Sequence, residues 1–482
     1  MSVNLPLNSK FSLKKELPCR EETYFIAPTG GEKTFSPGDP IVFRPALGND
    51  KLRCIYGHQS YIYFQVNYTF SAAGTIYLDS SANCFFNRVV VTGNGGVLQD
   101  FNKSNVYIPC VYNLTCSQMA RSSFFSFFGN NQNIQPLTTI ATLTDNTAAV
   151  ITTGLNQAIT NSTVNKTSVR KGHSITVAAA GDVHEMYGAL IPSFFGAFAQ
   201  RVFPISELAG SNFDLELYLD TQANAIVDAT TPILTSYTLD KLRLVLSIVE
   251  YSELISETVR RAYNNTFSIP CVSIQTYTQN LSTADTAVGS YTWPITATLK
   301  NAKGILFTFR SSQVVGQVAQ YSLSGRTSLG ITSAQLVVGP YVFPKNRQLM
   351  YESSTGIVSG SSHPNYFMSA MKYFGQNIDN RANCSVDYTT FHISGATAAN
   401  NTGAFVLAFN LEGLHENDAE FRSCLSLDGN STSINLITGI AGATGTTTTV
   451  DCFILYEFDV VISQGTAIAI NKYTGFENIN VK

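Results

Sequence analysis

Residues 213–220, with the sequence FDLELYLD, show the pattern that decides the fold. The apolar residues Phe213, Leu215, Leu217 and Leu219 alternate with the polar Asp214, Glu216, Tyr218 and Asp220. Successive side chains of a β-strand point to opposite faces of the sheet, so this alternation predicts a strand with one buried and one solvent-facing side.

Segments with strand-like composition recur along most of the chain. They are Tyr61–Phe70, Arg88–Thr92, Leu242–Glu250, Thr266–Thr278, Gly304–Arg310, Gln335–Val338, Phe405–Leu411 and Asp451–Ile462. Turn-forming sequences such as Gly93–Gly96 and Asp428-Gly429-Asn430 separate them. Many short strands without regular strand–helix alternation predict an all-β fold and argue against an α/β fold.

Three helices are predicted between the strands. Ser252 is placed to cap a helix over Glu253–Tyr263 that carries Leu254, Ile255 and Val259 on one face. A second helix begins at His363-Pro364 and ends at Gly375. Its apolar side is expected to consist of Phe367, Met368, Met371 and Phe374. A third helix is expected near Val111–Phe128.

The order of these elements repeats coarsely in the two halves of the chain. Around residues 60–100 and again around 304–376, two strands are followed by a glycine-containing turn and a helix. We therefore predict two tandem antiparallel sandwiches of about eight strands each, with a few short helices in the connecting loops. The predicted divisions are an N-terminal arm (1–22), a first sandwich (23–251) with a long loop at about 130–173, a helical linker (252–265) and a second sandwich (266–482).

The composition indicates a surface that is covered by partners. Of the 482 residues, 30 are Lys or Arg and 33 are Asp or Glu, so that the net charge is −3. Charged residues make up 13% of the chain, about half the usual share. This argues against a generally basic nucleic-acid coat, and the 44% hydrophobic content argues against disorder. A surface with so little charge favours extensive contacts with copies of the same chain or with other proteins.

The cysteines and the first residues predict a compartment without disulfide formation. The nine cysteines are odd in number and form no Cys-x-x-Cys pair, so we expect buried free thiols and no zinc site. Residues 1–22 lack the apolar block of a signal peptide, so export by a cleaved leader is not expected. The cysteines are Cys19, Cys54, Cys84, Cys110, Cys116, Cys271, Cys384, Cys424 and Cys452.

No motif for catalysis, cofactor binding or metal binding was found. The six histidines do not have the spacing of metal ligands, and neither a Gly-x-Ser-x-Gly elbow nor a phosphate-binding loop is present. We interpret His184-Glu185 as chance neighbours, Gly93–Gly96 and Gly439–Gly445 as turns, and Trp293 as a packing residue. An acidic group could hold Ca²⁺ or act as a glycosidase pair, but we interpret it as a solvated loop. It consists of Glu412, Glu416, Asp418 and Glu420.

The N-terminal arm combines basic and apolar residues. Lys10, Lys14 and Lys15 alternate with Phe11 and Leu13. Three lysines provide a weak attraction to nucleic acid or to lipid head groups. An arm that ties one subunit to the next is an equally good interpretation.

Several segments resemble a known family of viral proteins. Residues 201–217 (RVFPISELAGSNFDLEL), preceded by Met186-Tyr187-Gly188, resemble a passage of the major capsid proteins of polinton-like viruses and virophages. Residues 303–312 (KGILFTFRSS), 321–324 (YSLS) and 335–344 (QLVVGPYVFP) are also similar to that family. The resemblance covers roughly residues 186–376.

The resemblance implies a fold and a function. It implies two tandem eight-stranded jelly rolls, a homotrimeric pseudo-hexagonal capsomer, and an icosahedral virion assembled inside the host cell. It also implies penton and minor capsid or cement proteins as partners, and an inner face toward genome or membrane. Two alternatives stay open. One is a carbohydrate-binding or attachment protein built of β-sandwich modules, and the other is a double jelly-roll glycoamidase.

Overall fold

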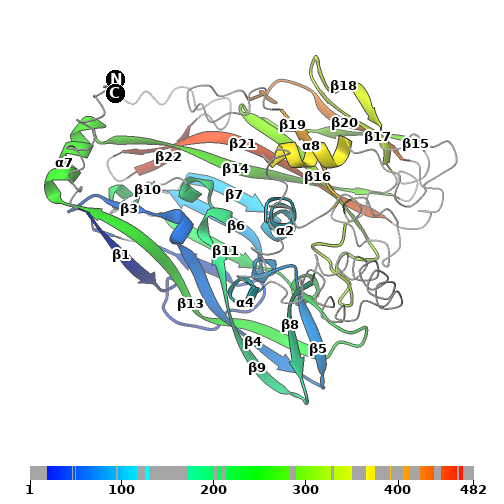
Figure 1. Cartoon of the computed structure of the whole chain (residues 1–482), viewed down its shortest axis with the longest axis horizontal. Helices are drawn as coiled ribbons and strands as arrows, with labels where there is room; N and C mark the ends of the chain where they lie inside the picture. Colours follow the sequence, from blue (N-terminus) through cyan, green and yellow to red (C-terminus); the bar gives the residue numbers. More distant parts are fainter. Residues whose placement is uncertain are drawn as a thin grey trace, which may run out of the picture.

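The structure is a computed structural model of the chain. It describes residues 19–45, 47–48, 50–93, 96–116, 125–129, 171–199, 203–208, 213–282, 289–326, 331–349, 365–374, 391, 405–411, 424–438, 447–463 and 466–470. Figure 1 shows an elongated stack of β-sheets crossed by a few short helices.

The largest sheet of the first half, sheet A, is organised around one long strand, β13 (Leu234–Tyr251). Along one side β13 pairs with β4 (Tyr61–Phe70) and then with β3 (Arg53–Ile55), and on the other side it pairs with β1 (Cys19–Ile26). The outer strands are β9 (Gly181–Leu190), beside β4, and β10 (Phe203–Pro204), beside β3. All of these pairings are antiparallel.

Two smaller sheets continue one another in the first half. Sheet B has the order β2 (Pro40–Phe43), β11 (Asp214–Leu219), β6 (Phe86–Gly93) and β7 (Gly96–Asn102). Sheet C has the order β12 (Ile226–Val227), β5 (Gly74–Asp79) and β8 (Lys171–Val177). The chain passes from β5 to β6 through the 3₁₀ helix η2 (Ala82–Phe85), and from β11 to β12 through α6 (Gln222–Ala225). Helix η2 separates β5 from β6, and α6 separates β11 from β12 at the same level. Sheets B and C therefore form one layer with a break.

The second half consists of two antiparallel sheets, one with five strands and one with four. Sheet E has the order β14 (Thr266–Leu281), β21 (Thr448–Ser463), β16 (Ala302–Ser311) and β19 (Leu407–Asn410), with β22 (Thr466–Ile470) also paired to β21. Sheet F has the order β15 (Gly289–Ile295), β20 (Thr432–Thr438), β17 (Ile331–Val338) and β18 (Tyr341–Leu349). Among the described residues, no strand that precedes residue 252 pairs with a strand that follows residue 265.

Further helices and 3₁₀ turns connect the strands. They are η1 (Gly57–Gln59), α2 (Ser104–Thr115), α4 (Phe125–Phe128), η4 (Ile191–Ser193), η5 (Gly196–Ala199), η6 (Ile205–Leu208), α7 (Glu253–Ala262) and α8 (Asn365–Tyr373). Helix α7 lies at one end of the molecule, where the chain passes from sheet A to sheet E (Figure 1). No helix in the described part of the chain is long and apolar enough to cross a membrane.

A single cluster of buried apolar side chains runs from Phe35 in the first half to Ile462 in the second. Figure 1 places sheet B between sheets A and E, and β7 contacts both β14 and β22. Burial of apolar surface, worth about 25 cal/mol per Å², therefore stabilises not only each sandwich but also their contact.

The strand predictions are confirmed, and β4 spans the predicted Tyr61–Phe70. The predictions for helix faces were partly wrong. Helix α7 forms where expected, but Leu254 is 75% exposed and only Ser256 of that helix is buried. On α8, Met371 is buried as predicted, whereas Met368 is exposed and Tyr366 and Tyr373 are buried in its place.

The expected third helix and the N-terminal arm also have different bounds. Helix α2 begins at Ser104, well before the predicted Val111, and a separate turn, α4, follows it. Strand β1 begins at Cys19, so residues 19–22 of the predicted arm belong to sheet A. Lys10, Lys14, Lys15 and residues 130–170 of the predicted long loop lie outside the described residues.

Candidate functional site

The contact between the two halves of the chain is built from close backbone approaches. A Cβ atom added to Gly196 of η5 would lie 1.8 Å from the backbone oxygen of Val272 in β14. Only glycine permits this distance, because every other residue places a carbon atom there. Nearby, the Thr276 hydroxyl donates to the backbone oxygen of Asn102 at 2.8 Å. The first strand of the second half is thereby held against the first half.

A buried carboxylate, Asp451 of β21, joins charged groups from both halves. Arg310 of β16 donates to Asp451 Oδ2 at 2.6 Å, and Lys103 of the first half lies 2.5 Å from Oδ1. The side chains of Asp451 and Arg310 are 0% and 4% exposed. Burial raises the pKa of Asp451, but Arg310 and Lys103 lower it by more, so the pKa lies below its usual value. The carboxylate is therefore charged at neutral pH and holds both cations.

The segment that follows β16, residues 312–326, enters the first half of the chain. Asp79 at the end of β5 accepts hydrogen bonds from the Leu323 backbone at 2.7 Å and from the Ser324 hydroxyl at 2.5 Å. The Ser322 hydroxyl donates to Asn224 Oδ1 at 2.7 Å. Asp79, Ser322 and Ser324 are all fully buried. These bonds fix the segment in the break between sheets B and C.

Helix α2 completes this junction with its buried side. Tyr107 packs against Phe453 of β21 with a ring-centroid distance of 5.2 Å, and its hydroxyl lies 3.5 Å from that of Tyr373. Arg326, which is fully buried, donates to the Cys110 sulfur. Burial raises the pKa of Cys110, and the nearby arginines offset this only partly. The junction thus contains a buried set of charged and polar groups, whereas Lys103 keeps 28% of its side chain exposed. The buried groups are Asp79, Arg310, Ser322, Ser324, Arg326 and Asp451.

A second group of charges lies at the end of β13, the central strand of sheet A. Glu250 of β13 is contacted by Arg53 at 2.9 Å, Lys51 at 3.1 Å and Arg20 at 3.3 Å. Burial raises the pKa of Glu250, but its hydrogen bonds to Lys51 and Arg53 and the charge of Arg20 lower it by more. The pKa of Glu250 therefore lies below its usual value. The group connects β1, β3 and β13 within the first half.

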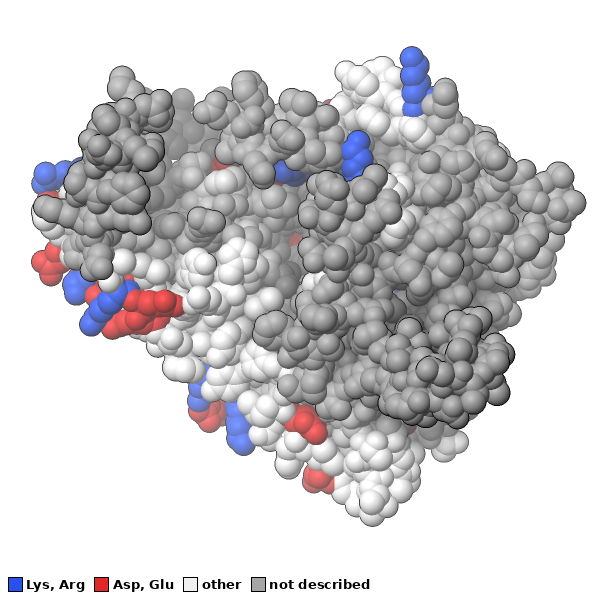
Figure 2. Space-filling model, viewed as in Figure 1, with Lys and Arg blue, Asp and Glu red and all other residues white. Residues whose placement is uncertain are grey.

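The exposed surface carries isolated large apolar residues and little charge. Figure 2 shows most of the charged side chains along one edge, with uncharged residues over much of the described surface. The exposed apolar residues with their exposed fractions are Leu254 (75%), Phe25 (63%), Tyr263 (59%), Val97 and Tyr341 (both 53%), Met186 (46%), Val342 and Met368 (both 36%). Large apolar residues scattered singly over a surface are common in proteins, and it is a contiguous apolar patch that marks an interface.

The residues considered as candidates from the sequence do not come together in a site. His184 is exposed on β9, and its Nδ1 lies 2.6 Å from Asn67 Oδ1. Gly93 and Gly96 face each other in the β6–β7 hairpin, as a turn requires. Trp293 is buried against Phe307, which confirms its packing role. The acidic group (Glu412, Glu416, Asp418, Glu420) and Gly439–Gly445 lie outside the described residues.

The cysteines in the described part of the chain are free thiols. Cys54, Cys84, Cys110, Cys271 and Cys452 are buried as predicted, whereas Cys19 is exposed on β1. Within the same part, no three His, Cys, Asp or Glu side chains are close enough to hold a metal ion. The junction around Asp451 was not predicted from the sequence. The only local signal was a charged residue within an apolar strand, Val450–Ile454.

The structure is similar to solved viral capsid proteins over almost its whole length. The capsid protein of the virus PBCV-1 matches with a TM-score of 0.54 and 11% identity, covering 95% of this chain and 98% of its own. A chain in the structure of the Sputnik virophage matches with a TM-score of 0.53 and 13% identity, covering 97% of this chain and 93% of its own. The mavirus major capsid protein matches with a TM-score of 0.51 and 11% identity, covering 97% and 95%.

The chain has the double jelly-roll fold of these capsid proteins. The predicted fold class, two tandem antiparallel jelly rolls with a few short helices, is confirmed. The resemblance to virophage major capsid proteins is confirmed at the level of the fold. No family model matches the sequence. No curated protein matches it either.

Proposed function

We propose that this chain is a major capsid protein that builds the icosahedral shell of a virion. The observation that carries the proposal is the fold match over 95–97% of the chain to capsid proteins of three viruses. The buried junction between the halves supports it, because a shell subunit must hold its two jelly rolls in one fixed orientation. The 13% charged content supports it further, since subunit contacts remove polar and charged groups from solvent.

The proposed assembly is a homotrimer with a pseudo-hexagonal outline. Three copies of a subunit with two similar domains present six similar sides, and a ring of head-to-tail contacts closes at three copies. Obligate interfaces of this kind bury about 2,000–5,000 Å² and are apolar. The exposed Phe25, Val97 and Met186 are the kind of residues that such contacts cover.

The proposed division of the subunit follows the predicted boundaries. Residues 23–251, together with residues 19–22 at the start of β1, form the first jelly roll, 252–265 the linker and 266–482 the second jelly roll. The sheet pairings, which do not cross α7 among the described residues, support this division. Penton proteins, minor capsid or cement proteins, and a weak contact of residues 1–22 with genome or membrane belong to the same proposal.

The test is the size and shape of the purified chain. Light scattering should give about three times 52.4 kDa, and negative-stain images should show hexagonal particles. Replacing Met186 with Glu should reduce the trimer fraction. Lys241→Gln, at an exposed position of β13 in the same sheet, changes the net charge by the same amount and is the matched control. A stable monomer in both images and scattering would contradict the proposal.

A screen with glycans separates the alternatives. Hydrolysis of an N-linked glycopeptide by a monomer would favour a glycoamidase, and binding to a glycan array by a monomer would favour an attachment protein. We propose that the chain has neither activity and acts as a structural protein.

A further inference from the structure

The two halves of the chain repeat the same order of strands. The order β1, β13, β4, β9 in sheet A corresponds to β14, β21, β16, β19 in sheet E. The order β2, β11, β6, β7 in sheet B corresponds to β15, β20, β17, β18 in sheet F. Strand β14 of the second half therefore occupies the position that β1 occupies in the first half, and β18 occupies the position of β7.

The outer face of β14, which points away from sheet F, is covered by the first half of the chain. Thr276 lies opposite Phe453, whose ring contacts helix α2, and the Thr276 hydroxyl donates to Asn102 at the end of β7. Ile274 is two residues away on the same face of the strand and is only 8% exposed. Strand β7 and helix α2 of the first half thus bury the outer face of the first strand of the second half.

The corresponding face of β1 is exposed. The two residues beside Phe25 in this strand are paired with the buried Leu244 and Leu246, so the Phe25 side chain points away from sheet B. Phe25 is 63% exposed, and Glu21 and Thr23, which lie on the same face, are exposed as well. The outer face of β1 therefore combines a large apolar side chain with a carboxylate.

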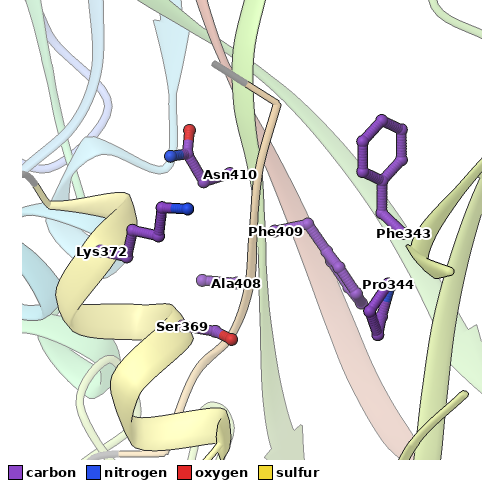
Figure 3. A pocket seen from close by; sticks show the side chains of 7 residues that line it. All are labelled: Phe343, Pro344, Ser369, Lys372, Ala408, Phe409 and Asn410. Atoms are coloured by element: carbon purple, nitrogen blue, oxygen red, sulfur yellow. The ribbon is translucent and has the colours of Figure 1, made fainter. Parts of the chain in front are cut away.

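The second half has a side that corresponds to the one with which the first half covers β14. We call it the β18–α8 side, because it consists of β18 and of α8, a helix that follows it, as α2 follows β7. A pocket of about 200 Å³ opens there, with Phe343 and Pro344 on one side, Lys372 on the other and Phe409 between them (Figure 3). Lys345 of β18 and Lys372 of α8 are exposed. This side is therefore hollow, with an apolar lining and basic groups beside it.

The outer face of β1 and the β18–α8 side match in chemistry but do not meet within one copy. Phe25 has an apolar side chain for the apolar pocket, and Glu21 has the opposite charge to Lys345 and Lys372. Figure 1 shows β1 and β18 at opposite ends of the molecule. A contact between the two surfaces therefore requires a second copy of the chain.

We infer that the outer face of β1 packs against the β18–α8 side of a neighbouring copy, with Phe25 directed at the pocket. This proposal rests on the proposed capsid function, because it names the surfaces that meet in the trimer. The contact between copies repeats the contact that β14 makes within one chain. Three copies then form a closed ring of six halves, in which every first strand is covered by the preceding half.

Photo-crosslinking of the full chain tests the contact. Phe25 is replaced by p-benzoylphenylalanine, and the trimer fraction is irradiated. The main products should contain two or three chains, with crosslinks from residue 25 to residues 341–345, 365–374 or 405–411 of another copy. The same probe at Leu254, which is 75% exposed on α7, is the control and should give several-fold fewer crosslinks to these segments.

The outcomes distinguish a wrong contact from a wrong function. If the probe at Phe25 is crosslinked only to other segments of the trimer, or only within its own chain, the contact is wrong and the proposed capsid function stands. If the chain stays monomeric, both are wrong.

A pair of substitutions provides a second measurement without a bulky probe. Phe25→Glu should raise the dissociation constant of the trimer about tenfold or more, because it places a charge in an apolar contact. Leu254→Glu adds the same charge at another exposed apolar position and should change the constant less than about twofold. Circular dichroism checks that both variants are folded. Equal constants for the wild type and both folded variants would overturn the inference.

Discussion

Asp451 and Glu250 are both carboxylates that bind several cations, but they lie in very different surroundings. Asp451 is at the junction of the two halves, and its partner Arg310 is 4% exposed. Glu250 is itself only 4% exposed, but Arg20 and Lys51, two of its partners, are 64% and 30% exposed. If Glu250 were removed, water would reach its cations. If Asp451 were removed, Arg310 would stay buried without a counter-charge.

The comparison shows at which of the two sites the stability of the fold depends on a charged side chain. A buried ion pair contributes little relative to apolar packing, but the loss of one partner is very costly. An ion pair that borders on solvent contributes little to stability, and the loss of one of its partners also costs little. The contact between the two jelly rolls is therefore sensitive to the loss of one buried charge, whereas the group around Glu250 at the end of β13 is expected to tolerate such a loss.

The largest effect is expected for Asp451→Asn. The substitution keeps the shape and removes the charge that Arg310 and Lys103 share, so we expect a loss of about 3–5 kcal/mol in the free energy of unfolding. Urea denaturation of the full chain measures it. A loss below 1 kcal/mol would show that solvent reaches the junction and would remove the distinction between the two carboxylates.

The pH dependence of the same variant is a further check. The folded-state pKa of Asp451 is lowered, so the carboxylate stabilises the fold above the unfolded-state pKa of about 3.9. This stabilisation is lost as the pH falls through the folded-state pKa. The difference between wild type and Asp451→Asn should therefore be constant from about pH 5 to 8 and become smaller below about pH 4. A difference that shrinks near pH 6 would contradict this assignment.

Which features the sequence could predict depends on how far apart in the chain the interacting residues lie. Strands such as β4 and β21 were predicted because the alternation of apolar residues is local and has a fixed period. The junction was not predicted, because Asp451 lies 141 residues from Arg310 and 348 from Lys103. No local pattern encodes which distant charges meet.

The helix faces show a different limit. The spacing of Leu254, Ile255 and Val259 indicated a buried face, but α7 lies at the end of the molecule with little to pack against, and Leu254 remains exposed. The periodicity of a helix identifies an apolar face but not whether the subunit itself covers that face. The family resemblance predicted the fold as a whole, because its motifs combine residues from several strands.

A smaller effect is expected for Asp79→Asn. This residue holds Leu323 and Ser324 of the segment that enters the first half, and one amide oxygen cannot replace two carboxylate oxygens. We expect a loss of about 1–3 kcal/mol. Unfolding should remain a single transition, measured by fluorescence and circular dichroism together. Two separate transitions would show that the halves unfold independently and that the junction does not couple them.

For Glu250→Gln we expect a loss of only about 1 kcal/mol. The amide keeps the packing of the side chain, and Arg20 and Lys51 turn to solvent. The same urea titration measures the loss, and added salt should reduce the difference from the wild type, because partly exposed pairs are screened. A loss as large as that of Asp451→Asn would show that the charges around Glu250 behave like those of the junction.

The smallest effect is expected for a pair that is exposed on both sides. Arg88 and Asp100 are 2.6 Å apart on neighbouring strands of sheet B, but their side chains are 40% and 39% exposed. Asp100→Asn should lower the free energy of unfolding by less than about 0.5 kcal/mol, because water replaces the lost partner. Its bond length is the same as that between Arg310 and Asp451. If the two substitutions differ as expected, burial and not bond length decides how strongly each ion pair holds this subunit together.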